Sequence, residues 1–254
     1  PTTMGLVKLM KDSEAGTSQY QYTFTVAGTA DEIVPLMVKG DLDIAMVPAN
    51  LASVLYNNTN GSVSVAAINT LGVLYIVETG DSIHSIQDLK GKTLYSTGKG
   101  TTPEYALNFV LAGNDIDPAR DLTIEYKSEA TEVAAALSAG TVSIAMLPQP
   151  YVTAVMAQNP DLRVALSLTD EWAKVNESSA LITGVALIRK AFLESNLDAV
   201  AAFLQEYAAS AEYVNANVDE AAQWVADLGI VAQAPIAARA IPASNIVCST
   251  GDEM

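Results

Sequence analysis

Short apolar runs alternate along the chain with stretches that have helical spacing. Four runs predict strands: "YTFTV" (22–26), "LDIAMV" (42–47), "LTIEY" (122–126) and "VSIAML" (142–147). The first and third are rich in β-branched and aromatic residues. The stretches that follow them open on a capping residue or a proline, and two of them close on glycine, which predicts short helices. The order strand, helix, strand, helix is typical of an α/β fold with parallel strands joined by helical crossovers.

This pattern occurs twice. "IAMVPANLASVLY" begins at Ile44 and "IAMLPQPYVTAVM" begins at Ile144, an offset of one hundred residues. Upstream, "TTMGLVKLM" at Thr2 matches "TTPEYALNFVL" at Thr101 with an offset of ninety-nine. Because the order of the predicted elements agrees as well as the residues, we interpret the repeat as two related lobes.

The two copies also set the expected domain boundaries. A predicted strand, "KTLYST" (92–97), precedes the second copy, so we expect a matching strand, and a leader, before Pro1. We expect lobe 1 at residues 1–78 and 184–254, including a C-terminal tail of helices without strands, and lobe 2 at 79–183. The predicted fold is α/β, with two similar lobes that are each a mostly parallel sheet flanked by helices, joined by two crossing strands.

Composition narrows the possible functions. The 254-residue chain is half hydrophobic and has a formal charge of −16, so it repels phosphate backbones and nucleic acid is not an expected partner. Apolar runs such as "GVALI" (184–188) are far shorter than the roughly 18 residues of a membrane span. One cysteine, Cys248, and one histidine, His84, are too few for a disulfide or a zinc site. We expect no metal, no cofactor and no catalytic residue, with His84 at the surface.

Two glycine–lysine segments invite a phosphate-loop interpretation, "GKT" (91–93) and "GKG" (98–100). A phosphate-binding loop requires a glycine five positions before the first glycine of such a segment. Those positions hold Ile86 and Thr93, so the motif is absent. Lys99 remains a candidate ligand contact, because it lies in a predicted strand-to-helix loop, although a solvated loop lysine is the other interpretation.

The helix starts of the repeat are the strongest candidates for a binding site. Ligands of open parallel sheets bind beyond the carboxyl ends of the strands, where helix N-termini expose unpaired N–H groups. If the lobes face each other, four such starts point into one cleft and suit a small ligand with an anionic or strongly polar end. A threonine at a helix start is often only a cap. The candidate residues at these starts are Thr2, Thr3, Asn50, Thr101, Thr102 and Gln149.

Several segments together resemble the substrate-binding proteins of bacterial ABC importers, in the subgroup associated with nitrate, sulfonate, taurine and thiamine-precursor uptake. They are "PTTMGLVKLM" (1–10), "GDLDIAMVPANLASVLYN" (40–57), "IQDLKGKTLYSTGKGTTPEYALNFVL" (86–111) and "GVALIRKAFLESNLDAVAAFL" (184–204). The resemblance covers nearly the whole chain. It implies a two-lobed clamshell of the type II periplasmic-binding class and an exported, extracytoplasmic protein, usually lipid-anchored in Gram-positive bacteria.

Carrying the family's positions across adds to the helix-start candidates. The resemblance implies Tyr151 as a further cleft residue, with secondary candidates Asn69, Thr70, Gly28, Thr29 and Glu129. Glu129 favours a ligand with a cationic or hydrogen-bond-donating group, which argues against sulfonate or nitrate and leaves amine-bearing heterocycles open. Trp172, near the second expected crossing, would either stack on a ligand ring or pack in the core.

The leading hypothesis is a non-catalytic solute receptor, expected to be a monomer, whose lobes close on a small polar organic molecule or anion. It would present the closed form to the membrane permease of an ABC importer. The alternative is an enzyme on the same clamshell, resembling menaquinone-pathway dehydratases or a pyrimidine synthase. A regulatory effector-binding domain ranks last, since no helix-turn-helix segment is present and the acidity disfavours DNA.

Overall fold

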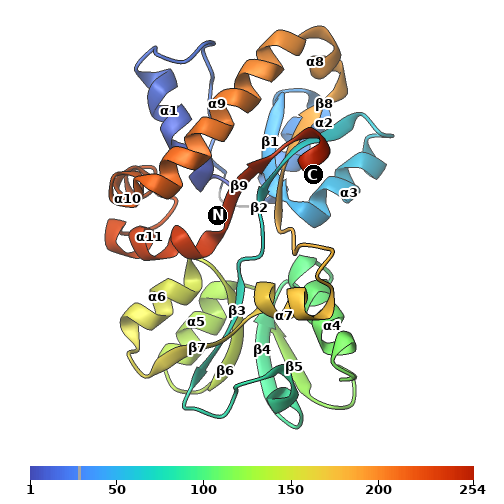
Figure 1. Cartoon of the computed structure of the whole chain (residues 1–254), viewed down its shortest axis with the longest axis vertical. Coiled ribbons are helices and arrows are strands. Elements are labelled where there is room, and N and C mark those ends of the chain that lie inside the picture. Colours follow the sequence, from blue (N-terminus) through green and yellow to red (C-terminus); the bar gives the residue numbers. More distant parts are fainter. Residues whose placement is uncertain (28–29) are drawn as a thin grey trace. The chain divides into compact units, whose positions relative to one another are not determined.

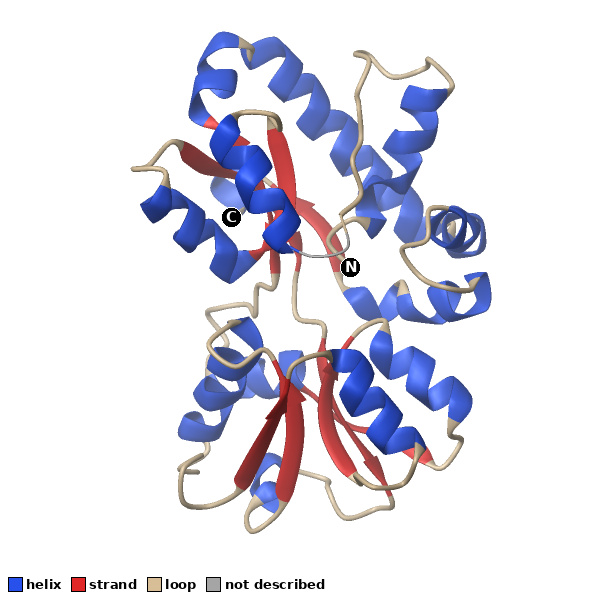
Figure 2. Cartoon of the chain, turned by 180° about the vertical axis from the view of Figure 1, so that it is seen from behind, coloured by secondary structure: helices blue, strands red, loops and turns tan. Residues whose placement is uncertain are grey.

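The computed structural model describes residues 1–27 and 30–254. The chain forms two compact units (Figure 1): unit 1 comprises Pro1–Leu71 and Ile182–Met254, and unit 2 comprises Gly72–Leu181. Each unit contains one β-sheet with helices on its faces (Figure 2). The predicted α/β class with two helix-flanked sheets is therefore confirmed.

Unit 2 contains a five-stranded sheet in the order β5-β4-β6-β3-β7. Its strands are β3 (Leu74–Thr79), β4 (Thr93–Thr97), β5 (Thr123–Lys127), β6 (Ile144–Pro148) and β7 (Leu162–Ser167). β4 runs parallel to β5 and β6, whereas β3 runs antiparallel to β6 and β7. The carboxyl ends of β4, β5, β6 and β7 and the start of β3 therefore lie at one edge of the sheet, which we call the unit 2 edge.

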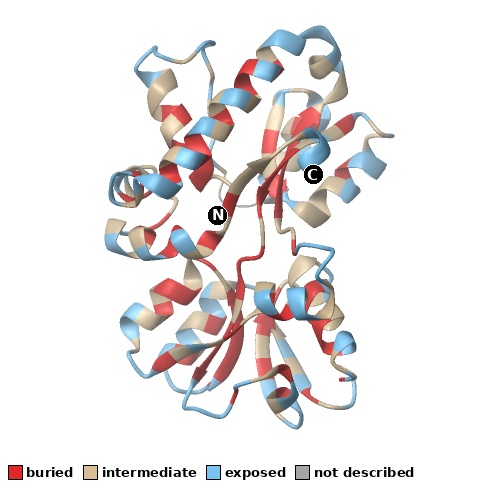
Figure 3. Ribbon diagram, in the orientation of Figure 1, coloured by how far each residue is buried: buried red, intermediate tan, exposed pale blue. Residues whose placement is uncertain are grey.

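Helices cover both faces of this sheet because alternate residues of each strand point to opposite sides. On β6, Met146 packs in a cluster with α4 (Thr102–Gly113), α7 (Leu168–Val175) and the 3₁₀ turn η2 (Ile86–Leu89). Leu147 packs in a second cluster with α5 (Ala130–Ser138) and α6 (Tyr151–Gln158). Burial of both faces explains why β6 is a continuous apolar run instead of an alternating one (Figure 3).

Unit 1 contains a four-stranded sheet in the order β1-β8-β2-β9. Its strands are β1 (Ile44–Pro48), β2 (Val63–Thr70), β8 (Gly184–Arg189) and β9 (Ile246–Ser249). Each described ladder is antiparallel, which differs from the expected mostly parallel sheet: β1 and β2 share a direction, but the returning strand β8 lies between them. The carboxyl ends of β1 and β2 and the starts of β8 and β9 form the unit 1 edge.

The helices of unit 1 also form two layers, one on each face of the sheet. On one face, α2 (Ala30–Lys39) and α3 (Ala49–Asn58) pack around Val47 and Leu187. On the other, Met46 packs with residues of α1 (Val7–Glu14) and α9 (Leu197–Ala216). The remaining elements of this unit are η1 (Met4–Leu6), α8 (Lys190–Ser195), α10 (Val218–Asp227), α11 (Ala234–Ala240), η3 (Pro242–Ser244) and η4 (Gly251–Glu253).

The expected lobe boundaries differ from the structure by a few residues. Residues 72–78 belong to unit 2, not to lobe 1, because β3 pairs with β6 and β7, and residues 182–183 belong to unit 1. The C-terminal tail is not purely helical, since β9 pairs with β2.

Residues 22–26 are not a strand, although their composition predicts one. Tyr22 instead contacts the ring of Phe203 edge-on, with centroids 5.6 Å apart, and its hydroxyl donates to Glu206 at 2.7 Å. This segment is therefore held by side-chain contacts to α9, and aromatic packing took the place of strand pairing.

Candidate functional site

The unit 1 edge brings three predicted site residues together around a glycine. Gly184 pairs with Pro48 on one side and Thr70 on the other. A Cβ atom on Gly184 would lie 2.6 Å from Thr2 Cγ2 and 3.0 Å from Thr70 Cβ, and would overlap Asn69 Oδ1. Only glycine allows these side chains to approach so closely, so Gly184 determines the geometry of this edge.

Asn69 and Thr70 are each only 1% exposed, so their hydrogen bonds within the protein determine which of their polar groups are left for a ligand. The Asn69 amide donates to Met46 Sδ at 3.2 Å, and its oxygen accepts the Thr70 hydroxyl at 3.0 Å. Nearby in this unit, the Tyr207 hydroxyl is buried without a hydrogen-bond partner among the described residues, and burial raises its pKa. Asn69 and Thr70 are therefore buried polar residues at this edge, whereas Thr2 and Thr3 are half-buried.

The helix α3 starts at this same edge, directly after β1. Pro48 is its N-cap residue, and no side chain caps its first turn. The first amide, of Ala49, donates to the Thr183 carbonyl at 3.0 Å. Asn50 is half-buried in this first turn, as expected from the repeat.

At the unit 2 edge, residues 98–101 form a tight loop between β4 and α4. Gly98 and Gly100 adopt φ angles of 74° and 76°, which favour glycine. The Thr101 hydroxyl donates to the Gly98 carbonyl at 2.6 Å, and the Gly100 N–H donates to Glu104 Oε2 at 2.5 Å. Thr101 and Thr102 start α4 as predicted. Two hydrogen-bond donors of this segment, the Gly100 N–H and the Thr101 hydroxyl, already donate to groups within it.

Sequence reasoning missed Glu104 and Tyr126. Glu104 is the third residue of α4. A glutamate at this position commonly folds back and accepts a hydrogen bond from the backbone at the helix start. This capping pattern was the sequence signal that could have identified Glu104. Tyr126 lies on β5, and Lys99 Nζ stands 5.9 Å from its ring centroid. Burial and the Glu104 carboxylate raise the pKa of Tyr126 to about 12, although its buried hydroxyl completes no standard hydrogen bond among the described residues.

The second helix start of this edge is α6. Gln149 is 4% exposed, and its side-chain oxygen accepts the Thr153 hydroxyl at 2.8 Å. Its backbone N–H donates to Val73 at 3.0 Å. Tyr151 is half-buried against the α5–α6 cluster, and Glu129 is exposed immediately before α5. The unit 2 edge thus gathers Lys99, Thr101, Thr102, Glu129, Gln149 and Tyr151 at the ends of its strands.

Two other candidates lie differently. Trp172 stacks on Phe109 with centroids 4.0 Å apart and an interplanar angle of 29°, and its indole N–H donates to the Ser179 hydroxyl at 2.9 Å. These contacts tie Trp172 into the packing between α4 and α7 within unit 2. Gly28 and Thr29 lie outside the described residues.

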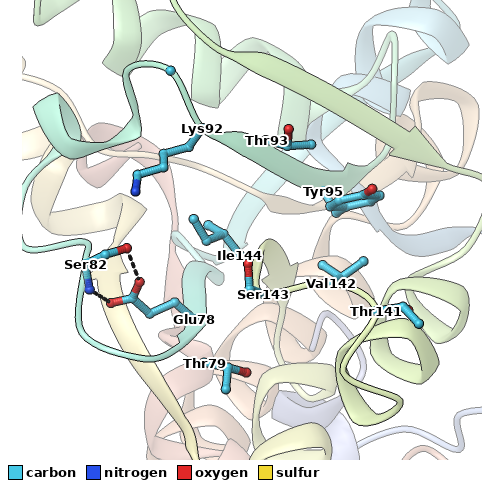
Figure 4. A pocket seen from close by; sticks show the side chains of 11 residues that line it. Glu78, Thr79, Ser82, Lys92, Thr93, Tyr95, Thr141, Val142, Ser143 and Ile144 are labelled. Atoms are coloured by element: carbon cyan, nitrogen blue, oxygen red, sulfur yellow. Dashed lines mark hydrogen bonds between the residues drawn. The ribbon is translucent and has the colours of Figure 1, made fainter.

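The opposite edge of the unit 2 sheet contains a cavity of about 430 Å³, lined by residues that include Glu78, Ser82 and Lys92 (Figure 4). Glu78 accepts hydrogen bonds from the Ser82 and Ile83 amides at 2.8 and 3.0 Å and pairs with Arg163 at 2.5 Å. Burial alone would raise the pKa of Glu78, but these hydrogen bonds together hold it below its usual value. Its acceptor capacity is therefore committed to the fold.

No group of three or more His, Cys, Asp or Glu side chains among the described residues could hold a metal ion. His84 is exposed and lies beside Asp81. No helix in residues 1–27 and 30–254 combines the length and apolar character needed to cross a bilayer.

Solved structures share this fold. An ABC transporter protein from Parabacteroides distasonis is 21% identical over 100% of this chain and 84% of its own, with a TM-score of 0.82. The periplasmic aliphatic sulphonate-binding protein SsuA from Escherichia coli is 16% identical over 97% of this chain and 78% of its own, with a TM-score of 0.74. A binding protein of a phosphonate transporter from Pseudomonas aeruginosa is 17% identical over 99% and 77%, with a TM-score of 0.55. The fold is that of the periplasmic binding proteins.

The family assignment comes from sequence. A family model described as the periplasmic substrate-binding protein of phosphonate ABC transporters matches residues 9–239. The chain belongs to this family, and it is therefore the substrate-binding component of an ABC transporter. No curated protein sequence matches it.

Proposed function

We propose that the chain is an extracytoplasmic receptor that binds a small polar organic molecule or anion with both edges. We further propose that a hinge closes on the ligand where the chain crosses between the units, at Leu71–Gly72 and at Leu181–Ile182. Chain connectivity is the observation that supports this proposal. β2 ends at Thr70 on the unit 1 edge and β3 begins at Leu74 on the unit 2 edge, so only three residues separate the two edges along the chain. Both edges thus adjoin the same crossing.

The two crossing segments support a hinge because they contact one another, both where they leave unit 1 and where they enter unit 2. In unit 1, the Thr183 N–H donates to the Thr70 carbonyl at 3.0 Å, and the Thr183 hydroxyl donates to the Leu71 carbonyl. In unit 2, a Cβ atom on Gly72 would lie 3.1 Å from Leu181 and would overlap the Thr169 hydroxyl. A hinge requires a few residues at the ends of elements to absorb the backbone rotation.

The ligand would drive closure only through contacts that are better in the closed state. The neutral hydrogen-bonding groups for it are Thr2, Thr3 and Asn50 on unit 1, and Thr101, Thr102 and the side-chain NH₂ group of Gln149 on unit 2. The closed receptor would dock on a membrane permease as a monomer without catalysing a reaction. A lipid anchor and the nitrate, taurine or thiamine-precursor subgroup remain predictions from the sequence.

Calorimetry of the double variant Thr101→Ala/Thr102→Ala tests the site. The ligand is first identified by a thermal-shift screen, since a tight ligand raises apparent stability by mass action. Loss of two hydrogen-bonding groups is expected to weaken binding at least tenfold with little change in fold. Thr93→Ala, an exposed threonine at the opposite end of β4, is the matched control. An unchanged affinity of the double variant would remove α4 from the site.

A further inference from the structure

Unit 1 buries one polar group that its own packing leaves unsatisfied. Tyr207 lies on α9 and is 0% exposed, and its hydroxyl has no hydrogen-bond partner among the described residues. The ring is held by packing, since it stacks on Phe203 with centroids 6.0 Å apart and an interplanar angle of 22°. A buried hydroxyl without a partner costs stability, and a phenylalanine would pack the same ring without that cost. The hydroxyl therefore calls for a role other than folding.

The Tyr207 hydroxyl lies where α9, η1 and β9 meet. A Cβ atom on Gly5, in η1, would lie 3.3 Å from this hydroxyl and 2.9 Å from Ile246 Cγ2. Ile246, on β9, is the register partner of Thr70 at the end of β2. The hydroxyl is therefore next to the buried residues of the unit 1 edge.

Asn69 is the polar neighbour of this hydroxyl. Burial and the nearby Cys248 raise the pKa of Tyr207, and the Asn69 amide opposes that rise. The two groups nevertheless complete no standard hydrogen bond, and the amide donates to Met46 Sδ, in the same apolar cluster, at 3.2 Å. A thioether sulfur is a weak acceptor. The Asn69 amide is thus held by a contact that a stronger acceptor can replace.

The Asn69 side chain also reaches the unit 1 edge. A Cβ atom on Gly184 would overlap Asn69 Oδ1, and this oxygen accepts the Thr70 hydroxyl at 3.0 Å. An amide oxygen has two lone pairs, so it has the capacity for a second hydrogen bond. The neighbouring Tyr207 hydroxyl is a donor that suits it.

We propose that Tyr207 is a positioning residue of the unit 1 edge, which acts on the ligand through Asn69. When a ligand binds, the Asn69 amide exchanges the Met46 sulfur for an acceptor oxygen of the ligand, and the Tyr207 hydroxyl donates to Asn69 Oδ1. Two hydrogen bonds at this oxygen polarise the amide and strengthen its N–H donors. The bound state thereby gains a contact that the free state lacks, which favours binding. This inference rests on the proposed function and deepens it for unit 1.

Two matched variants test it, Tyr207→Phe and Tyr22→Phe. Both rings pack in one apolar cluster, but the Tyr22 hydroxyl donates to Glu206 at 2.7 Å, whereas that of Tyr207 has no partner among the described residues. In calorimetry with the solute found by thermal-shift screening, Tyr207→Phe is expected to bind about tenfold more weakly, because the polarising hydrogen bond is lost. Its urea midpoint should be unchanged or higher. Tyr22→Phe should show the reverse, a lower urea midpoint and the affinity of the wild type.

A double-mutant cycle tests whether Asn69 is the intermediary. In an Asn69→Ala background, Tyr207→Phe should cause no further loss of affinity, because the group through which it acts is gone. A purely structural effect of the hydroxyl would not depend on Asn69. Equal losses of affinity in the two backgrounds would overturn the inference.

Two results for the single variant would also overturn it. An unchanged affinity of Tyr207→Phe would show that the hydroxyl has no effect on the ligand. A urea midpoint lowered as much as that of Tyr22→Phe would show that the hydroxyl is already paired in the free protein, and this readout requires no ligand. In each case a wild type that binds its solute keeps the receptor function, which fails only if a broad thermal-shift screen finds no solute at all.

Discussion

The two edges are built on the same repeated elements, yet their chemistry differs. At the unit 1 edge, three uncharged side chains, those of Thr2, Asn69 and Thr70, close around Gly184. At the unit 2 edge, a glycine loop carries Lys99 and folds onto Glu104. The repeated elements thus bring strand ends and helix starts together in both units, while the side chains at the two edges differ.

The helix starts keep one contact in common and differ in another. At α3, the Ala49 backbone N–H donates to the Thr183 carbonyl, and at α6 the equivalent Gln149 backbone N–H donates to the Val73 carbonyl, both at 3.0 Å. The Gln149 side chain also accepts from the Thr153 hydroxyl. The two helix starts therefore differ in their side chains and not in the use of this backbone donor.

The largest effect on stability is expected at the end of the unit 2 sheet that lies opposite the unit 2 edge. Glu78→Gln removes a carboxylate that is 1% exposed and holds Arg163 and two backbone amides, so the free energy of unfolding should fall by about 3 kcal/mol. Urea denaturation measures this. Ligand affinity should stay within twofold, and a parallel loss of affinity would contradict the separation of the two edges of this sheet.

The same substitution has a defined pH dependence. Because the folded-state pKa of Glu78 lies below its usual value of 4.5, its contribution is fully present above that value and is lost as the pH falls through the folded pKa. The difference in stability between the wild type and Glu78→Gln should therefore shrink on acidification below about pH 4. A difference that is constant with pH would show that the charge of Glu78 is not responsible.

A smaller effect is expected from Gly184→Ala on unit 1. The added methyl group would force Thr2, Asn69 and Thr70 apart, so stability should fall by about 1–3 kcal/mol and ligand affinity should fall at least tenfold. Gly113→Ala is the comparison in unit 2, because its methyl group would meet Val175 between α4 and α7. Gly113→Ala should lower stability to a similar degree, with a smaller loss of ligand affinity than Gly184→Ala. Equal losses of affinity in calorimetry would mean that Gly184 affects binding through stability alone.

The smallest effect is expected from Trp172→Phe. A phenyl ring keeps the stacking on Phe109 and loses only the hydrogen bond to Ser179, so stability should change by about 1 kcal/mol. Ligand affinity should not change, because the contacts of Trp172 are to its own unit. A tenfold weaker affinity in calorimetry would instead assign Trp172 to ligand stacking.

The repeat predicted the scaffold because periodicity and element order follow directly from residue type. It located the starts of α3, α4 and α6, and thereby Asn50, Thr101 and Thr102 at strand ends. It could not predict that β8 returns between β1 and β2, since strand pairing over more than a hundred residues has no local signal. It also missed residues 22–26, where aromatic contacts to α9 replaced strand pairing.

The site itself was less predictable than the fold. Asn69 and Thr70 were candidates only through the family resemblance, and in the structure they are the buried end of β2, close to Gly184. Glu104 was hidden because a glutamate in a first helical turn is ordinary, and only the fold of the 98–101 loop brings its carboxylate to Gly100. Side-chain contacts of this kind depend on rotamers and loop shape, which a single sequence does not specify.

Amide hydrogen exchange with and without the identified ligand tests the central claim, that one solute is bound by both edges. A saturating ligand should slow exchange together in two peptides, one covering residues 47–52 after β1 and one covering residues 98–105 after β4. Protection confined to one unit, at full occupancy measured by calorimetry, would contradict the joint site.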